Sequence, residues 1–234
     1  MYMRYKNYCE RLLFVVIICS ISYAFLSYAI TFRILPGLGG YAREVLIKNN
    51  HIKKALFSPD NRIKEVLIGL INEEQKSLAM AAFTLTDMDM AQALIDAHDR
   101  KVALEIVVDG GCMENEYSKV AKLAAAGIPV YSYPVKKEEV ERDRWHSLMH
   151  NKFIIFGKSI TQKAVLWTGS FNFTRSASTS NQENVLVLDD QELVAEYRKQ
   201  FTLLKERSML LNGTVKKSVP DQAGTTELWK WLCA

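Results

Sequence analysis

The feature that most constrains the fold is an alternation of strand-like and helix-like segments between about residue 58 and residue 211. The clearest strands are VALEIVVD at residues 102–109 and ENVLVL at residues 183–188. Apolar residues recur with helical spacing over residues 87–100 and 190–211. Because strands that alternate with helices pack in layers around a sheet, the sequence predicts an α/β sandwich around a mixed sheet.

The predicted domain covers residues 57–212. Weaker sequence patterns predict its remaining helices and strands, each as an apolar run bounded by residues that favour turns or helix caps. The additional elements are a helix capped by Ser58-Pro59-Asp60, strands at 77–84 and 129–133, a helix at 114–126, and two strands at 149–156 and 164–168. The last two strands are expected to pair around a polar turn, and the charged stretch at 136–145 is expected to be a loop.

The segments next to this domain show no such periodicity. Residues 33–56 include Pro36 and a glycine-rich run at 37–40, which break regular structure, so a linker is predicted there. Residues 213–234 contain no clear apolar repeat and are predicted to be a loose C-terminal tail.

Residues 12–32 form an uncharged stretch flanked by Arg11 and Arg33. About 20 apolar residues in a helix span the hydrocarbon core of a bilayer, so a single-pass membrane anchor is predicted. A cleaved signal peptide is the alternative, because a basic start precedes the stretch and Ser27-Tyr28-Ala29 resembles a cleavage site. The predicted location is a membrane, or a secreted or periplasmic one after cleavage, and the basic residues leave the orientation open.

Composition says little about partners. Apolar residues make up 49% of the chain and charged residues 24%, which is typical of a globular protein and not of a disordered one. The formal net charge of +4 favours phosphate-bearing partners only mildly. The four cysteines, Cys9, Cys19, Cys112 and Cys233, match neither a zinc-ligand spacing nor a disulfide framework, so they are interpreted as unpaired thiols.

The residues best suited to catalysis lie in the stretch 149–189. His150 and Lys152 are two positions apart in a predicted strand, where alternate side chains share a face. Imidazole titrates near neutrality and can attack or donate a proton, while an ammonium can neutralise charge that grows on a phosphoryl oxygen. A lone His-x-Lys pair is usually structural or merely exposed, so this pair alone does not identify a site.

Further polar residues strengthen this interpretation. The segment at residues 168–172 (TGSFN) forms a tight turn, and its Ser170 hydroxyl and Asn172 amide can hold phosphate oxygens. Glu183 begins another predicted strand and can accept the proton of an imidazole nitrogen, which would fix the tautomer of a histidine.

Taken together, the strings His150-Asn151-Lys152, TGSFNFT at 168–174 and NQEN at 181–184 resemble the HKD signature of the phospholipase D superfamily. The likeness is strongest to short members with one motif, which include bacterial endonuclease-type proteins and mitochondrial cardiolipin hydrolases. The resemblance implies a phospholipase D-like α/β sandwich, with a mixed sheet flanked by helices, preceded here by the predicted transmembrane helix.

The resemblance also implies a role for each site residue. His150 would be the nucleophile and would form a phosphohistidine. Lys152 and Asn172 would bind phosphate oxygens, Ser170 would support the pocket, and Glu183 would orient the histidine ring. The family's chemistry uses two such histidines, whereas this chain has one motif, so two chains would pair as a homodimer around a composite site. The resemblance implies no metal and no cofactor.

One position departs from the family pattern. The family places an aspartate five residues after the lysine of the motif, where this chain has Gly157. In the family this aspartate is usually read as structural support. Its loss therefore puts stability or alignment in doubt more than it removes the reaction chemistry.

Three functions are compatible with these observations. The favoured one is cleavage of a phospholipid phosphodiester, because an anchor would hold the site near a bilayer. The same chemistry on DNA or RNA is the alternative, and a membrane-tethered binding module with a decayed site is the third.

Asp109, at the end of the strand 102–109, is interpreted as a helix cap or ion-pair partner and not as a site residue.

Overall fold

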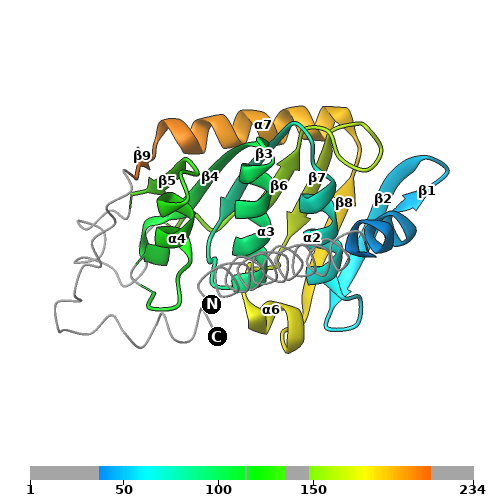
Figure 1. Ribbon diagram of the computed structural model, residues 1–234, viewed down its shortest axis with the longest axis horizontal. Coiled ribbons are helices and arrows are strands. Elements are labelled where there is room, and N and C mark those ends of the chain that lie inside the picture. The colour runs from blue at the N-terminus through cyan, green and yellow to red at the C-terminus, as the bar shows by residue number, and fades with distance from the viewer. Residues whose placement is uncertain (1–36, 114, 135–147, 212–234) are drawn as a thin grey trace, which may run out of the picture.

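A computed structural model describes residues 37–113, 115–134 and 148–211 of the chain. Strands and helices alternate along most of this length (Figure 1). The elements are β1 Ile47–Lys48, β2 His51–Ser58, α2 Ile63–Glu73, β3 Ser77–Ala82, α3 Met88–Asp99, β4 Ala103–Asp109, a 3-10 helix Gly110–Met113, α4 Val120–Ala125, β5 Val130–Tyr133, β6 Lys152–Phe156, β7 Val165–Gly169, α6 Arg175–Thr179, β8 Glu183–Leu188, α7 Gln191–Glu206 and β9 Met209–Leu210.

The strands of the described residues form one sheet in the order β1-β2-β8-β7-β6-β3-β4-β5-β9. The neighbours β3, β4 and β5 are parallel, and the remaining pairs are antiparallel. Helices α2, α3 and α4 lie side by side over one face of this sheet (Figure 1). The prediction of an α/β sandwich with a mixed sheet and flanking helices is therefore confirmed.

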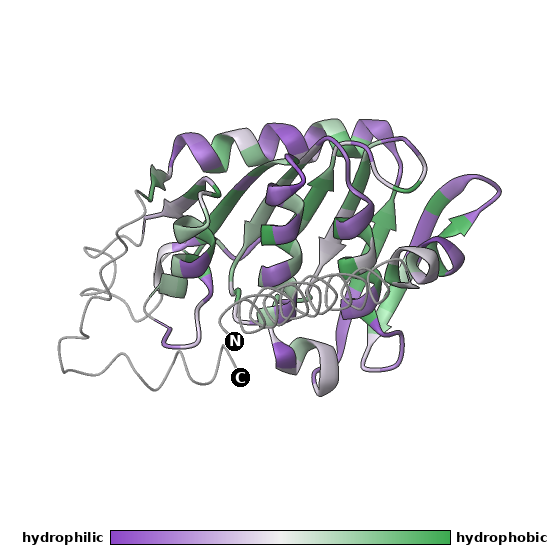
Figure 2. Ribbon diagram, viewed as in Figure 1, coloured by the Kyte–Doolittle hydropathy of each residue, from purple (hydrophilic) through white to green (hydrophobic). Residues whose placement is uncertain are grey.

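Alternation along the strands divides the core between the two faces. In β3, Met80 packs in the cluster that contains α2 and α3, while Ala81 packs in the cluster that contains α7. In β6, Ile154 and Ile155 divide in the same way. Because both faces of the central strands are covered, these strands are mostly apolar, as the predominantly green strands of Figure 2 show.

The predicted linker at residues 33–56 is wrong over the residues that the structure describes. Residues 37–46 are helical, and β1 and β2 follow as a hairpin at the end of the sheet. Ala42 and Leu46 are almost completely buried. A Cβ atom at Gly69 would lie 2.3 Å from the carbonyl oxygen of Leu38, so glycine in α2 allows this helix to pack closely. Burial of its apolar side overrides the low helix propensity of the glycine-rich run.

Other boundaries also differ from the predicted ones. Helix α2 begins at Ile63 and not at the predicted cap, because the Asn61 side chain accepts a hydrogen bond from the amide of Phe57 and closes a turn there. The helix predicted at 114–126 is shorter and forms only over α4. Strand β6 begins at Lys152, so the prediction that His150 lies in the same strand is wrong.

Some predicted segments lie outside the described residues: the membrane anchor at 12–32, the charged loop at 136–145 apart from its edges, and the tail at 213–234. Among the helices of the described residues, none combines the length and the apolar character needed to cross a bilayer.

Candidate active site

The predicted site residues gather at one end of the strands, along the side of the sheet where several neighbouring strands begin or end. Lys152 begins β6 and is paired with Ala82 at the end of β3. Glu183 begins β8 and is paired with Ser58 at the end of β2. Since β7 ends at Gly169, the chain delivers Ser170 to the same edge.

Gly169 makes this arrangement possible. A Cβ atom at this position would lie 2.1 Å from the carbonyl oxygen of Asn184, a separation that real side chains do not adopt. The close approach allows the amide of Ser170 to donate a hydrogen bond of 3.0 Å to the same carbonyl. Ser170 is thereby fixed next to the start of β8.

Lys152 presents a buried ammonium at this edge. The residue is 7% exposed, and its Nζ donates a hydrogen bond of 2.8 Å to the carbonyl oxygen of His150. The same Nζ lies 5.0 Å from the centroid of the Phe83 ring. Burial lowers the pKa of Lys152 to about 8, and the charge on Glu183 opposes this fall. A cation that is partly desolvated in this way interacts strongly with an incoming anion.

His150 lies two residues before the first residue of β6 and is exposed. Its ring meets the edge of Phe83, with a centroid separation of 4.5 Å and an interplanar angle of 60°. Although the residue as a whole is exposed, burial of its ring lowers the pKa of His150, and the charge of Lys152 lowers it further. The imidazole is therefore mainly neutral near pH 7, which is the form that can act as a nucleophile.

Glu183 and Ser170 form the second part of the site. The Ser170 hydroxyl donates a hydrogen bond of 2.5 Å to Oε2 of Glu183, and the Asn181 amide donates one of 3.4 Å to Oε1. The backbone amide of Glu183 donates to the Ser58 hydroxyl at 3.2 Å. The carboxylate is thus bonded to Ser170 and Asn181 and not to the His150 ring, and its effect on the Lys152 ammonium is electrostatic.

Asn172 lies on the loop that continues from Ser170. The flanking Phe171 and Phe173 are buried, and the backbone of Phe173 donates to Thr84 and accepts from Thr86. This pairing holds the loop alongside the segment that follows β3. The side-chain oxygen of Asn172 is buried and finds no hydrogen-bond partner within the described part of the chain. An unpaired buried amide oxygen is costly in a folded protein and suits a site that receives a ligand.

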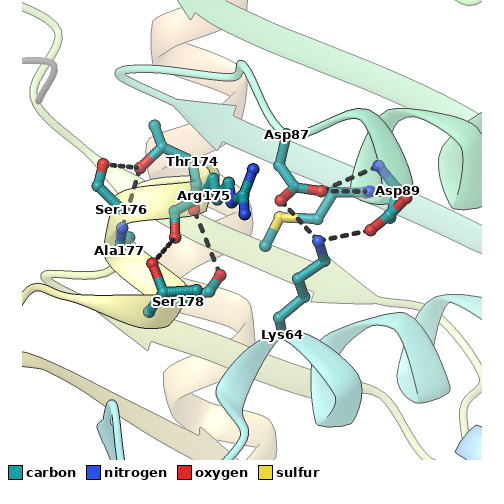
Figure 3. A network of polar contacts seen from close by, with 10 residues as sticks. Lys64, Asp87, Asp89, Thr174, Arg175, Ser176, Ala177 and Ser178 are labelled. Carbon is teal, nitrogen blue, oxygen red and sulfur yellow. Dashed lines mark hydrogen bonds and ion pairs between the residues drawn. The ribbon is translucent and has the colours of Figure 1, made fainter.

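A network of polar contacts supports this loop from outside (Figure 3). The Asp87 carboxylate caps α3 by accepting from the amides of Asp89 and Met90, and it accepts 2.7 Å from the Lys64 ammonium. The Thr174 hydroxyl caps α6 by accepting from the amide of Ala177. Thr174 lies two residues after Asn172, and the amide of Asp87 donates to the carbonyl oxygen of Phe173, so the two caps hold the end of the turn that follows Asn172.

A buried carboxylate, that of Glu74, lies close to Gly157, the position at which the family motif has an aspartate. Glu74 is 1% exposed and accepts hydrogen bonds from the amides of Lys76, Ser77 and Lys158, at 2.8, 3.0 and 2.9 Å. These bonds join the start of β3 to the residue after Gly157. A Cβ atom at Gly157 would lie 2.3 Å from the Ser77 hydroxyl, so a larger residue there would require Ser77 to move. Glu74 thus links the start of β3 to the end of β6 beside Gly157.

Sequence reasoning missed one contact residue and gave only part of the role of another. Phe83 was not singled out, although it contacts both His150 and Lys152, and its position directly after a buried strand was the available signal. Asp109 was interpreted as a cap or ion-pair partner. It does accept a hydrogen bond from the amide of Gly111, but its other oxygen accepts from the amide of Met149, next to His150.

A metal site is not visible in this arrangement. Among the residues that the structure describes, no three His, Cys, Asp or Glu side chains gather in a way that could hold a metal ion. The positive charge nearest to the imidazole in this part of the chain is the Lys152 ammonium.

Comparison with known proteins identifies relatives of this arrangement. Residues 67–205 match the family described as "Cardiolipin synthase, PLD-like domain". A phospholipase D from Rickettsia bellii is 34% identical over 152 residues, which are 65% of this chain and 68% of that protein. A mitochondrial cardiolipin hydrolase from Xenopus laevis is 31% identical over 147 residues, 63% of this chain and 62% of that protein. The chain thus spans about two thirds of the length of these relatives.

The fold has a counterpart among solved structures. The phospholipase D family member Nuc from Salmonella typhimurium superimposes with a TM-score of 0.58 at 24% sequence identity. The match covers 69% of this chain and 98% of Nuc. The similarity extends over almost the whole of Nuc, and at this identity it supports the fold alone.

Proposed function

The chain belongs to the phospholipase D superfamily and carries the site of a phosphodiesterase of that type, and from this premise we propose that it hydrolyses a phospholipid phosphodiester through a phosphohistidine on His150. The observation that carries the proposal is a buried ammonium next to an exposed imidazole. Lys152 is bonded to the backbone of His150, and both side chains contact Phe83. A neutral imidazole beside a desolvated cation suits attack on a phosphorus atom that carries negative charge.

The reaction has two steps in this proposal. A ring nitrogen of His150 attacks phosphorus, the phosphorus–oxygen bond to one alcohol breaks, and that alcohol leaves with a proton from a second histidine. Water then attacks the phosphohistidine, the phosphorus–nitrogen bond breaks, and the second histidine recovers its proton from the water. Lys152 holds a non-bridging oxygen in both steps, so it offsets the charge that develops there.

Asn172, Ser170 and Glu183 complete the proposed site. The side-chain NH2 group of Asn172 is proposed to donate to a second phosphate oxygen, while its buried oxygen, which has no partner in the described residues, is available to a donor such as a protonated phosphate or an alcohol of the substrate. Ser170 shapes the pocket through its bond to Glu183. Glu183 acts on the imidazole through the field it exerts on Lys152 and through the position of Ser170.

A phospholipid is the proposed substrate because the relatives compared above include a phospholipase D and a cardiolipin hydrolase. Residues 12–32 are proposed as a membrane anchor that holds the site near such a substrate. The location proposed for the chain is accordingly a membrane. Cleavage of a nucleic acid by the same chemistry is the competing outcome of the experiment below.

A homodimer is proposed as the active form, because the reaction needs a nucleophile and an acid and the chain has one motif. The described residues support a position for the interface. Phe57 and Leu186 are 54% and 46% exposed, and they lie on the paired strands β2 and β8. Apolar residues exposed on neighbouring strands favour burial against another surface. Phe57 is paired with Asn184, the residue after Glu183, so this exposed surface reaches the end of β8 that carries the site, although Leu186 and Glu183 lie on opposite faces of the strand.

The proposed function is tested by incubating the protein with vesicles of anionic or zwitterionic phospholipids, and with single-stranded DNA and RNA, in the presence of EDTA. We expect release of a headgroup or a phosphatidic acid from a phospholipid, which mass spectrometry detects. EDTA is not expected to reduce this rate, because Lys152 supplies the positive charge. Cleavage confined to nucleic acid, with binding that weakens steeply as salt rises, would instead support the competing function. Dependence on an added divalent ion would contradict the mechanism.

Replacing Glu183 with glutamine is expected to lower kcat by about tenfold or more while KM changes little. The amide keeps the shape but removes the charge that supports the Lys152 ammonium, so the alkaline limb of the pH profile should also move to lower pH. Steady-state kinetics from pH 5 to 10 measure both effects. Glu192→Gln, an exposed carboxylate on α7, is the control. An unchanged rate and profile would show that Glu183 has no part in the reaction.

The wild-type kcat/KM is expected to fall as pH rises through about 8. Burial lowers the pKa of Lys152 to about 8, so its phosphate-binding charge is present below that pH and lost above it. In Lys152→Arg the cation stays protonated throughout this range, so the fall near pH 8 should disappear, although the larger group lowers the overall rate. A limb that remains near pH 8 in this variant would assign the titration to a different group.

A further inference from the structure

Asp109 joins the end of β4 to the segment that carries His150. Its side chain is buried, with 1% of the residue exposed. One carboxylate oxygen accepts a hydrogen bond of 2.9 Å from the amide of Gly111, and the other accepts one of 2.9 Å from the amide of Met149. The residue therefore bridges its own turn and the residue directly before His150.

His150 needs such a bridge because it lies outside the sheet ladder. Strand β6 begins at Lys152, so the ladder does not hold the two residues before it. The carbonyl oxygen of His150 accepts from the Lys152 ammonium, and the Met149 side chain is 2% exposed. One residue earlier in the chain, Asp109 holds the Met149 amide. The backbone of His150 is thus fixed between an anion and a cation.

We propose that Asp109 is a positioning residue for catalysis, which acts by holding the Met149 amide and so fixes the direction from which the His150 ring meets the substrate. This inference rests on the proposed function of His150 as the nucleophile. A buried carboxylate holds an amide more tightly than a neutral acceptor does, because the hydrogen bond is charge-assisted. A displacement of about 1 Å at an attacking group is enough to cost on the order of a hundredfold in rate.

The first test is Asp109→Asn. The amide side chain offers one oxygen to two backbone donors, so the NH2 group must face either Gly111 or Met149. We expect kcat to fall by about 10- to 100-fold, as found for residues that orient a reacting group, while KM changes by less than about twofold. Formation of the phosphoenzyme in a single turnover should slow by the same factor.

Glu74→Gln is the matched control. Glu74 is also a buried carboxylate, and it also accepts from a backbone amide that flanks β6, namely that of Lys158 after the strand. It lies at the opposite edge of the sheet from His150. The two variants should lower the melting temperature to a similar extent, but only Asp109→Asn should lower kcat. Equal losses of kcat in both variants would reduce Asp109 to a residue that supports the fold, and an unchanged kcat in Asp109→Asn would also overturn the proposal.

A second variant removes the donor and leaves Asp109 intact. Incorporation of the α-hydroxy analogue of methionine at position 149 replaces the amide N–H with an ester oxygen, so the hydrogen bond is lost without a change in any side chain. This variant should reproduce the loss of kcat even if Asp109→Asn fails to fold. A fully active ester variant would overturn the proposal.

The ester variant also gives a readout that needs no turnover. Burial of the ring and the charge on Lys152 lower the pKa of His150. A segment released from Asp109 moves the ring into water and away from Lys152, so its pKa should rise by about half a unit or more, as histidine NMR titration measures. If wild type cleaves no phosphodiester, the proposed function fails, and this titration still decides the position of Asp109. An unchanged pKa would contradict the bridging role.

Discussion

Replacing His150 with asparagine is expected to abolish phosphodiester hydrolysis, with a loss of at least about a thousandfold. Asparagine keeps a polar side chain of similar reach but has no nucleophilic ring nitrogen, so the covalent route through a phosphohistidine is closed. The fold should be unaffected, because His150 is exposed and its ring contact is with Phe83 alone among the described aromatic residues. Circular dichroism and thermal melting should match those of wild type.

The measurement combines turnover with trapping of the covalent intermediate. Wild-type protein quenched in base during turnover should retain on His150 a phosphoryl group that still carries one alcohol of the substrate, which peptide mass spectrometry locates, and the variant should retain none. His51→Asn is the matched control, because His51 is also exposed but begins β2 at the opposite edge of the sheet. A variant that keeps more than about a tenth of the wild-type rate would remove His150 from the central role.

An excess of inactive His150→Ala chains is expected to inactivate wild-type chains. If one site needs a histidine from each of two chains, a heterodimer contains one nucleophile and no acid. With a ninefold excess of the variant during co-expression, only about a tenth of wild-type chains find a wild-type partner in a two-fold dimer. Activity per wild-type chain should therefore fall to about a tenth.

The result is read from purified mixtures of known composition. Two affinity tags distinguish the chains, and quantitative mass spectrometry gives their ratio. Activity per wild-type chain that stays constant as the variant increases would mean that the second catalytic group lies in the same chain. A monomer with full activity in analytical ultracentrifugation would lead to the same conclusion.

The position of the proposed interface can be tested in the same assay. Leu186→Glu introduces a charge into the exposed apolar surface of β8, and it should produce monomers with little activity. Met209→Glu is the control, because Met209 is 68% exposed but lies on β9 at the far side of the sheet order. Dimers that survive the change at Leu186 would place the interface on another surface.

Local patterns in the sequence were sufficient for the fold class and for a set of candidate site residues. The alternation of short apolar strand-like segments with helical segments predicted the mixed α/β sandwich, and Glu183–Leu188 forms the strand that its sequence predicted. The motif strings placed Lys152, Ser170 and Glu183 at strand ends, and the structure brings these ends to one edge of the sheet. Such features depend on neighbours in the sequence, so they can be read without the fold.

Burial against distant elements could not be predicted in this way. Residues 37–46 look like a glycine-rich linker, yet they form a helix because Gly69 in α2 leaves room for the backbone at Leu38. Helix propensity contributes little free energy per residue, and the burial of an apolar helix face outweighs it. The same reason explains why β1 and β2 extend the sheet where a linker was predicted.

The tertiary structure alone decided how His150 and the altered motif are supported. Met149 and Asp109 are 40 residues apart, and Lys158 and Glu74 are 84 residues apart, so no spacing rule connects either pair. The sequence does not show which carboxylate will accept a hydrogen bond from a given backbone amide. The sequence determined which groups are candidates for the chemistry. The packing of distant strand ends determined which carboxylates hold the neighbouring backbone, because a buried anion is stable only where folding brings donors to it.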